Sequence, residues 1–252
     1  TIHLEREDGR DYVLRSVDKE AGRIWDEELR KTIALDLAQD QFSIINPYSA
    51  VIIPTLADAI GTYHTNPKIY YVPKDPQLGL YAEDIGRQLA LFEERPNGDM
   101  SDVASVGFSE EVISSTELLR ELDHEDQWRW ASFEPEDEQG KIYKPIPRDR
   151  DIALMNMTGV IPSLAKVLGP FKQYQNFSED YGNLKGLNNN SLAMTRRFTN
   201  QLTKEDWLAI AQEIETALSD EVIEEAVLNY PEPVFQKYGE ETIAILKTRR
   251  NQ

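Results

Sequence analysis

The densest polar cluster of the sequence is the run Pro147-Arg148-Asp149-Arg150-Asp151, which follows a predicted strand. Asp149 and Asp151 are two residues apart, so on an extended segment both carboxylates point to one side and the arginines to the other. Two such carboxylates suit Mg²⁺, which takes one or two of them together with substrate phosphates. Exposed salt-bridge clusters have the same spacing, and spacing alone favours them. The run is therefore a candidate magnesium site, with a surface ion-pair cluster as the alternative.

A second cluster, Asp123-His124-Glu125-Asp126-Gln127, contains one of the three histidines. A histidine among carboxylates can be a general base, a metal ligand or a hydrogen-bonded loop residue. His3 and His64 are distant in sequence and show no ligand spacing, which disfavours a zinc hydrolase. Trp128 and Trp130 share one face of the strand that follows, and this pattern favours a place in the core.

Basic residues near the end of a strand form a third group. Arg15 and Lys19 follow a predicted hairpin, and a basic strand residue in such a place can hold nucleotide phosphates. Asp40, on the next predicted helix, could be their acidic partner. Glu93 closes the last strand of the N-terminal half, where a nucleotide-binding hinge would fall in a kinase-like fold. For Arg15 alone, a strand residue that extends its charged end into water is the more common situation.

Composition limits the functions that these clusters can serve. The chain has 45 acidic and 27 basic residues and a formal net charge of −18, which argues against binding to nucleic acid or to an anionic membrane. There is no cysteine, so thiolate zinc sites, disulfides and cysteine nucleophiles are excluded. No apolar run approaches the roughly 20 residues of a membrane helix. The first residues read like the interior of a longer chain.

The elements that must position these residues change in type along the chain. Strand signals dominate the first part, and helical signals dominate beyond residue 155, a pattern typical of an α+β protein with two lobes. The break Pro96-Asn97-Gly98-Asp99 predicts the boundary, with an N-lobe at 1–96 and a C-lobe at 97–252. Strands are predicted at 1–6, 12–17, 68–72, 87–94, 128–133 and 141–146, and helices at 26–42, from Asn46-Pro47 to Gly61, at 114–122, after Thr203, and from about 220 and 238.

The helix after Thr203 has the clearest sequence signature. Thr203-Lys204-Glu205-Asp206 resembles a capping box in which Asp206 replaces the usual Glu or Gln. Apolar residues then recur at helical spacing along one face. They are Trp207, Ile210, Ala211, Ile214 and Leu218.

Eight runs, spread over nearly the whole chain, carry a resemblance to known proteins. They are Tyr12-Val13-Leu14-Arg15-Ser16-Val17-Asp18-Lys19, Ile45-Asn46-Pro47-Tyr48, Tyr63-His64-Thr65-Asn66-Pro67, Leu91-Phe92-Glu93-Glu94-Arg95-Pro96, His124-Glu125-Asp126-Gln127-Trp128-Arg129-Trp130, Pro145-Ile146-Pro147-Arg148-Asp149-Arg150-Asp151, Arg196-Arg197-Phe198 and Leu202-Thr203-Lys204-Glu205-Asp206-Trp207. In this order they resemble one family of large bacterial envelope proteins, which combines a calcineurin-like metallophosphoesterase with a BamA/TamA-type outer-membrane barrel.

The order of these elements is also similar to atypical kinases of the CotH, HipA and Fam20 kind. That resemblance implies a two-lobed fold that binds ATP and Mg²⁺ in one cleft between the lobes. It implies catalytic roles for Asp123 and His124, and metal binding by three residues, Gln127, Asp149 and Asp151. It also implies that Arg15, Lys19, Asp40 and Glu93 bind the cofactor. Relatives carry a helix before the His124 run that this chain lacks, so we expect a shortened loop, or a break in the chain, between Asp123 and His124.

Three functions follow from these patterns. The first is an atypical kinase-like domain, active or degenerate, in the bacterial cell envelope, periplasmic or associated with the outer membrane. The second is a non-catalytic interaction module whose partner is an outer-membrane barrel or another envelope protein. The third, an accessory part of a metallophosphoesterase, is disfavoured because such enzymes need several His and Asp motifs around two metals.

Overall fold

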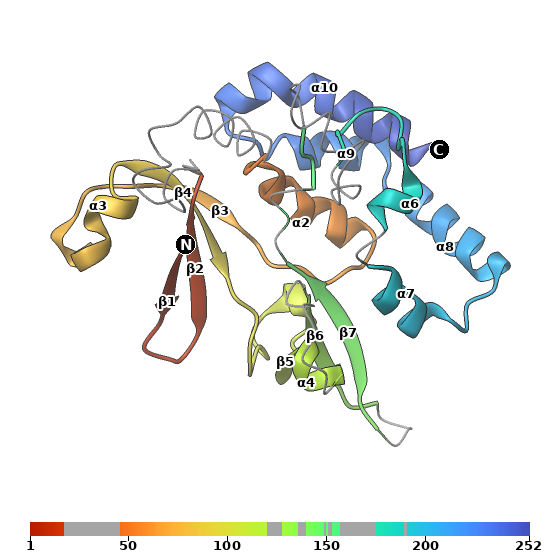
Figure 1. The fold of residues 1–252 in the computed structure, drawn as a ribbon, viewed down its shortest axis with the longest axis horizontal. Coiled ribbons are helices and arrows are strands. Elements are labelled where there is room, and N and C mark those ends of the chain that lie inside the picture. Colours follow the sequence, from red (N-terminus) through yellow and green to blue (C-terminus); the bar gives the residue numbers. More distant parts are fainter. Residues whose placement is uncertain are drawn as a thin grey trace, which may run out of the picture. The chain divides into compact units, whose positions relative to one another are not determined.

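The computed structural model describes residues 1–17, 46–119, 128–135, 140–148, 150, 153–156, 175–188 and 191–252. Within them the chain is a mixed α+β protein with two small antiparallel sheets, as the sequence predicts at the level of fold class (Figure 1). Contacts divide the chain into two compact units. One unit combines Thr1–Asp18 with Ala50–Arg150, and the other combines Lys19–Ser49 with Asp151–Gln252. The break at Pro96–Asp99 lies inside the first unit.

The first sheet has four strands in the order β1-β2-β4-β3. They are β1 (Ile2–Glu5), β2 (Asp11–Ser16), β3 (Lys68–Val72) and β4 (Gln88–Glu94). The predicted N-terminal hairpin is confirmed, since β1 pairs antiparallel with β2 and Ile2 lies opposite Leu14. Its turn is closed by a hydrogen bond from the Gly9 amide to the Arg6 carbonyl at 2.8 Å, and Gly9 supplies the positive φ of 82° that such a turn requires.

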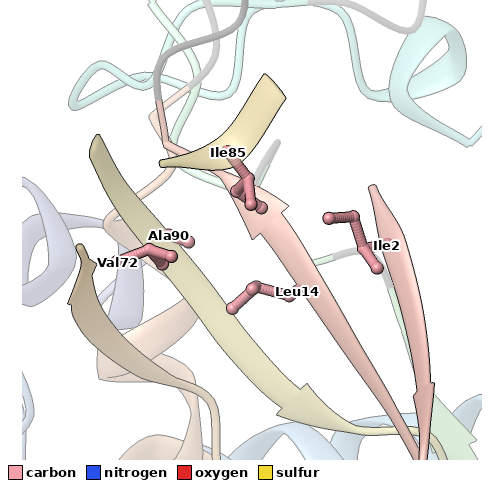
Figure 2. Packing of buried hydrophobic residues seen from close by; sticks show 5 residues of the cluster. All are labelled: Ile2, Leu14, Val72, Ile85 and Ala90. Atoms are coloured by element: carbon pink, nitrogen blue, oxygen red, sulfur yellow. The ribbon is translucent and has the colours of Figure 1, made fainter. Parts of the chain in front are cut away.

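One face of this sheet carries a small apolar core. Figure 2 shows five buried residues, which come from all four strands and from the short helix α3 (Ala82–Ile85). Leu78, from the 3-10 segment η3 (Pro76–Tyr81), and Phe92 pack against them. The buried residues are Ile2, Leu14, Val72, Ile85 and Ala90.

The second sheet lies in the same unit and has the order β5-β6-β7. Its strands are β5 (Glu111–Ser114), β6 (Trp128–Phe133) and β7 (Ile142–Pro147). The predicted hairpin of β6 and β7 is confirmed, whereas β5 was not predicted. Trp130 is buried, as its alternation with Trp128 predicts, and its indole N–H donates to the Ser115 hydroxyl at 3.0 Å.

Short helices complete this unit. The helix α2 (Ser49–Ala59) begins after Asn46-Pro47, because the Asn46 side chain caps a turn by accepting a hydrogen bond from the Tyr48 amide at 3.1 Å. The 3-10 segment η4 (Ala104–Val106) and the helix α4 (Ser115–Leu119) flank β5. Buried residues around this sheet form a second core, made of Met100, Val106, Val112, Ala131 and Ile146.

The described elements of the second unit are helical. They are α6 (Leu184–Leu187), α7 (Leu192–Thr199), α8 (Lys204–Ala217), α9 (Asp220–Val227) and α10 (Glu232–Arg250). α9 and α10 pack on each other and bury Ile223, Val227 and Ile245. Two basic residues of α10 form ion pairs with α9. Lys247 Nζ lies 2.6 Å from a Glu224 oxygen, and Arg250 Nη1 lies 2.7 Å from an Asp220 oxygen. Among the described residues, no helix has the length and apolarity needed to span a bilayer.

Candidate functional site

Two of the predicted site residues meet on one face of the first sheet. Arg15 on β2 and Glu93 on β4 lie on paired strands, two residues out of direct opposition, because Val13 is the residue opposite Glu93. The Arg15 Nη1 atom lies 3.5 Å from Glu93 Oε2, and the Glu93 side chain is only 7% exposed. The basic residue that the sequence assigns to nucleotide phosphates is therefore engaged with a buried carboxylate of the chain itself.

Arg150 and Thr65 complete this cluster around Glu93. The Arg150 Nη2 atom lies 2.7 Å from Glu93 Oε1, and the arginine side chain is 6% exposed. The Thr65 hydroxyl donates to the same Glu93 oxygen, and Arg150 also contacts the Thr65 hydroxyl and its carbonyl oxygen. A carboxylate removed from water needs such charged and hydrogen-bonding partners, because an unpaired buried charge is strongly unfavourable. We call these four residues, Arg15, Thr65, Glu93 and Arg150, the Glu93 cluster.

The Glu93 cluster ties together three parts of the first unit that are far apart in sequence. Glu93 belongs to the first sheet, Arg150 follows the last strand of the second sheet, and Thr65 lies in the segment after α2. His64, next to Thr65, is 1% exposed, and its backbone amide donates to the Ser105 carbonyl at 3.0 Å. These contacts give the cluster a structural role that holds the two sheets in one unit.

Two oxygen atoms of the chain lie within hydrogen-bond distance of the His64 ring. Its Nε2 atom lies 2.8 Å from an Asp58 carboxylate oxygen, and its Nδ1 atom lies 3.0 Å from the Thr65 carbonyl oxygen. Both ring nitrogens of His64 therefore lie within hydrogen-bond distance of oxygen atoms of the chain itself. Within the described residues, no group of three or more His, Asp or Glu side chains is placed to hold a metal ion.

The other predicted site residues lie outside the described residues. They are Lys19, Asp40, Asp123, His124, Gln127, Asp149 and Asp151. Their convergence on one cleft with Arg15, and the expected shortened loop or chain break at Asp123, stay predictions. Arg150 was grouped with Arg148 in a candidate surface cluster, and this placement was wrong for Arg150, whose side chain is buried against Glu93.

The helix α8 provides a surface of a different kind. Every residue from Lys204 to Thr216 is exposed. Trp207 is 46% exposed, and Ile210 and Ile214 are each 38% exposed. With Ala211 these residues form one stripe at helical spacing, which we call the α8 apolar face.

This helix is nevertheless well formed at its N-terminus. The Thr203 hydroxyl accepts a hydrogen bond from the Asp206 amide at 3.2 Å, and the Thr203 amide donates to an Asp206 carboxylate oxygen at 2.8 Å. These bonds confirm the predicted capping box. The Thr203 amide and the Thr203 hydroxyl both donate to the Asp206 carboxylate, and these two bonds lower the pKa of the Asp206 carboxyl because they stabilise its ionised form. The sequence thus specifies an amphipathic helix whose apolar side is left exposed.

No protein-family model, curated protein or solved structure matches this chain. The case for a function therefore rests on the two features described above, the buried Glu93 cluster and the exposed α8 apolar face.

Proposed function

We propose that this chain is a non-catalytic interaction module that binds a protein partner through the α8 apolar face. The observation that carries the proposal is the exposure of Trp207, Ile210 and Ile214 along a single capped helix. Short helices are marginal in water by themselves, and in proteins they are stabilised mainly by packing of their apolar side. A helix whose apolar stripe is exposed in the described part of the chain is therefore suited to a partner that supplies packing for it.

The Glu93 cluster supports the same proposal from the first unit. Arg15, the described member of the proposed phosphate-binding pair, is held by a carboxylate that is itself buried. A strand arginine in this position stabilises the unit by pairing with Glu93, and phosphate binding would have to compete with that ion pair. In the envelope setting that the resemblance implies, the partner would be an outer-membrane barrel or another envelope protein.

Photo-crosslinking on α8 tests the interaction directly. Benzoylphenylalanine at Trp207 places a reactive ring on the apolar face, and the same group at Gln212 places it on the opposite side of the helix. We expect a discrete crosslinked species from position 207 in the cells that produce the protein, and none from position 212. Equal crosslinking at both positions, or none at position 207, would contradict the proposal.

The kinase-like function remains a second candidate because of one specific observation. Protein kinases pair a strand lysine with a glutamate of a helix when the nucleotide site is assembled. Arg15 is a basic strand residue that pairs with a glutamate, although Glu93 lies on the neighbouring strand. In this proposal Asp149 and Asp151 would hold Mg²⁺, with catalytic roles for Asp123 and His124.

Thermal unfolding with and without ATP and Mg²⁺ separates the two candidates. A ligand that binds only the folded chain must raise the melting temperature. The interaction module predicts an unchanged melting temperature at millimolar ATP, and the kinase-like candidate predicts a rise that Asp149→Asn abolishes. A rise of that kind would overturn the non-catalytic proposal.

A further inference from the structure

The charges that border the α8 apolar face indicate which kind of partner fits it. Successive residues of an α-helix are turned by about 100°. Glu213 follows Ile210 by three positions and Glu215 follows Ala211 by four, so the two carboxylates lie along opposite edges of the stripe. Within the described part of the chain, neither carboxylate has an ion-pair partner. Among the described residues, the stripe is thus bordered on each side by a carboxylate without an ion-pair partner.

The other charged residues of the helix lie in its first turn. Glu205 lies on the far side of α8 from the stripe, and Asp206 is held in the capping box. Lys204 is the single basic residue of the helix, at its first turn. A second copy of the chain would therefore bring like-charged helices together, and each chain already has a net charge of −18. Like charges placed face to face oppose association.

We infer that the occupant of the α8 apolar face is an amphipathic helix whose own apolar stripe is bordered by Lys or Arg. This inference rests on the proposed function and names the partner class for the same surface. Apolar side chains at i, i+3, i+4 and i+7 are the anchors of helix-to-helix recognition, and Trp207, Ile210, Ala211 and Ile214 have this spacing. Basic residues on the partner would face Glu213 and Glu215, and charges at such flanking positions set partner choice and orientation.

Three synthetic helical peptides of about four turns each provide the test, with binding to the full chain followed by fluorescence anisotropy. The first has a Leu stripe flanked by Lys, the second has the same stripe flanked by Glu, and the third keeps the Lys flanks but replaces the stripe with Ser. We expect the first peptide to bind at least about tenfold more tightly than either of the others. Ile210→Asp should abolish binding of the first peptide, while Thr216→Asp, on the opposite side of the helix, should leave it unchanged.

Charge reversal separates this inference from the proposed function. In the Glu213→Lys/Glu215→Lys double variant, the preference should move from the Lys-flanked to the Glu-flanked peptide. Equal binding of the two peptides, still lost in Ile210→Asp, would overturn the charge argument and leave the proposed function standing. Binding that survives Ile210→Asp, or no binding by any peptide, would overturn the inference.

Two further measurements cover the other possible occupants. Light scattering of the wild-type chain would overturn the inference if it showed a dimer that Ile210→Asp dissociates, because the occupant would then be a second copy. Flotation with phosphatidylglycerol vesicles would overturn it if the chain bound them through the same residue, since the occupant would then be a lipid surface.

Discussion

Glu93 shows how far single residues could be assigned from the sequence. The sequence patterns placed Glu93 at a nucleotide-binding hinge and assigned Arg15 to the binding of nucleotide phosphates. Their ion pair depends on the register of β2 on β4, which joins residues far apart in the chain. The contribution of Arg150 depends on a third segment. Contacts of this range follow from tertiary packing, and local spacing carries no information about them.

Removing the carboxylate of Glu93 should therefore be costly. Glu93→Gln leaves two arginines beside a neutral amide, and breaking a buried ion pair by removing one partner typically costs about 3–5 kcal/mol. We expect a loss of that size in the free energy of unfolding, measured by urea denaturation.

Its neighbour Glu94 is the matched control. Burial raises the pKa of the Glu94 carboxyl, although Arg10 Nη1 lies 3.2 Å from its Oε1 atom. The ionised form of Glu94 is therefore not favoured by folding, and Glu94→Gln should change the free energy of unfolding by less than about 1 kcal/mol. Equal losses in the two variants would show that the Glu93 cluster is not the main electrostatic support of this unit.

At the scale of elements, local signals were sufficient for hairpins and caps. The hairpin of β1 and β2, the strand β3 and the capping box of α8 were each specified by neighbouring residues. β5 was missed because it has only four residues and because the helix predicted at 114–122 begins at its last residue. α10 begins at Glu232, several residues before the predicted start, because Pro233 is tolerated in a first helical turn where its missing N–H has no helical partner.

The capping box of α8 should control that helix locally. Thr203→Ala removes a side-chain acceptor worth about 1 kcal/mol to a helix. Because α8 is exposed along its length, we expect faster hydrogen exchange of its amides, with no change in exchange within the two sheets. Thr216→Ala is the control, since it alters an exposed threonine of the same helix and leaves the cap intact. Unchanged α8 exchange in Thr203→Ala would contradict a locally stabilised helix.

The ion pairs between α9 and α10 should make the stability of the chain depend on pH in the acidic range. Hydrogen bonds from Arg250 and then from Lys247 lower the pKa of Asp220 below its ordinary value of 3.8. A lowered carboxyl pKa contributes stability that is present above the ordinary value and is lost as the pH falls through the folded value. The effect is reduced by solvent, because the Asp220 side chain is 53% exposed.

Melting temperatures measured from pH 5 to pH 2 test this prediction. Asp220→Asn should show a shallower fall on acidification than the wild-type chain. Glu225→Gln, which changes an exposed carboxylate of the same helix without an ion pair in the described residues, should keep the wild-type slope. If Asp220→Asn kept the wild-type slope of melting temperature against pH, these ion pairs would not contribute to the stability of the chain in acid.

At the scale of the whole molecule, the division into units could not be read from a linear boundary. The first unit joins Thr1–Asp18 to Ala50–Arg150, and the contacts assign the segment between them, Lys19–Ser49, to the second unit. A composition break such as Pro96–Asp99 marks a turn within one unit as readily as a boundary between two. The acidic composition, in contrast, was informative. Two of the many carboxylates, Glu213 and Glu215, border the α8 apolar face, and their charge favours a basic partner.

The central claim is that the α8 apolar face packs against a partner and not against the core of this chain. Comparing the free energy of unfolding of Ile214→Ala and Ile223→Ala tests it most directly. Ile223 is 1% exposed, and Ile214 is 38% exposed. Truncating a buried isoleucine costs about 2–5 kcal/mol, so we predict that loss for Ile223→Ala and a change within about 0.5 kcal/mol for Ile214→Ala. A loss at Ile214 as large as that at Ile223 would show that this face belongs to the core, and the account would be contradicted.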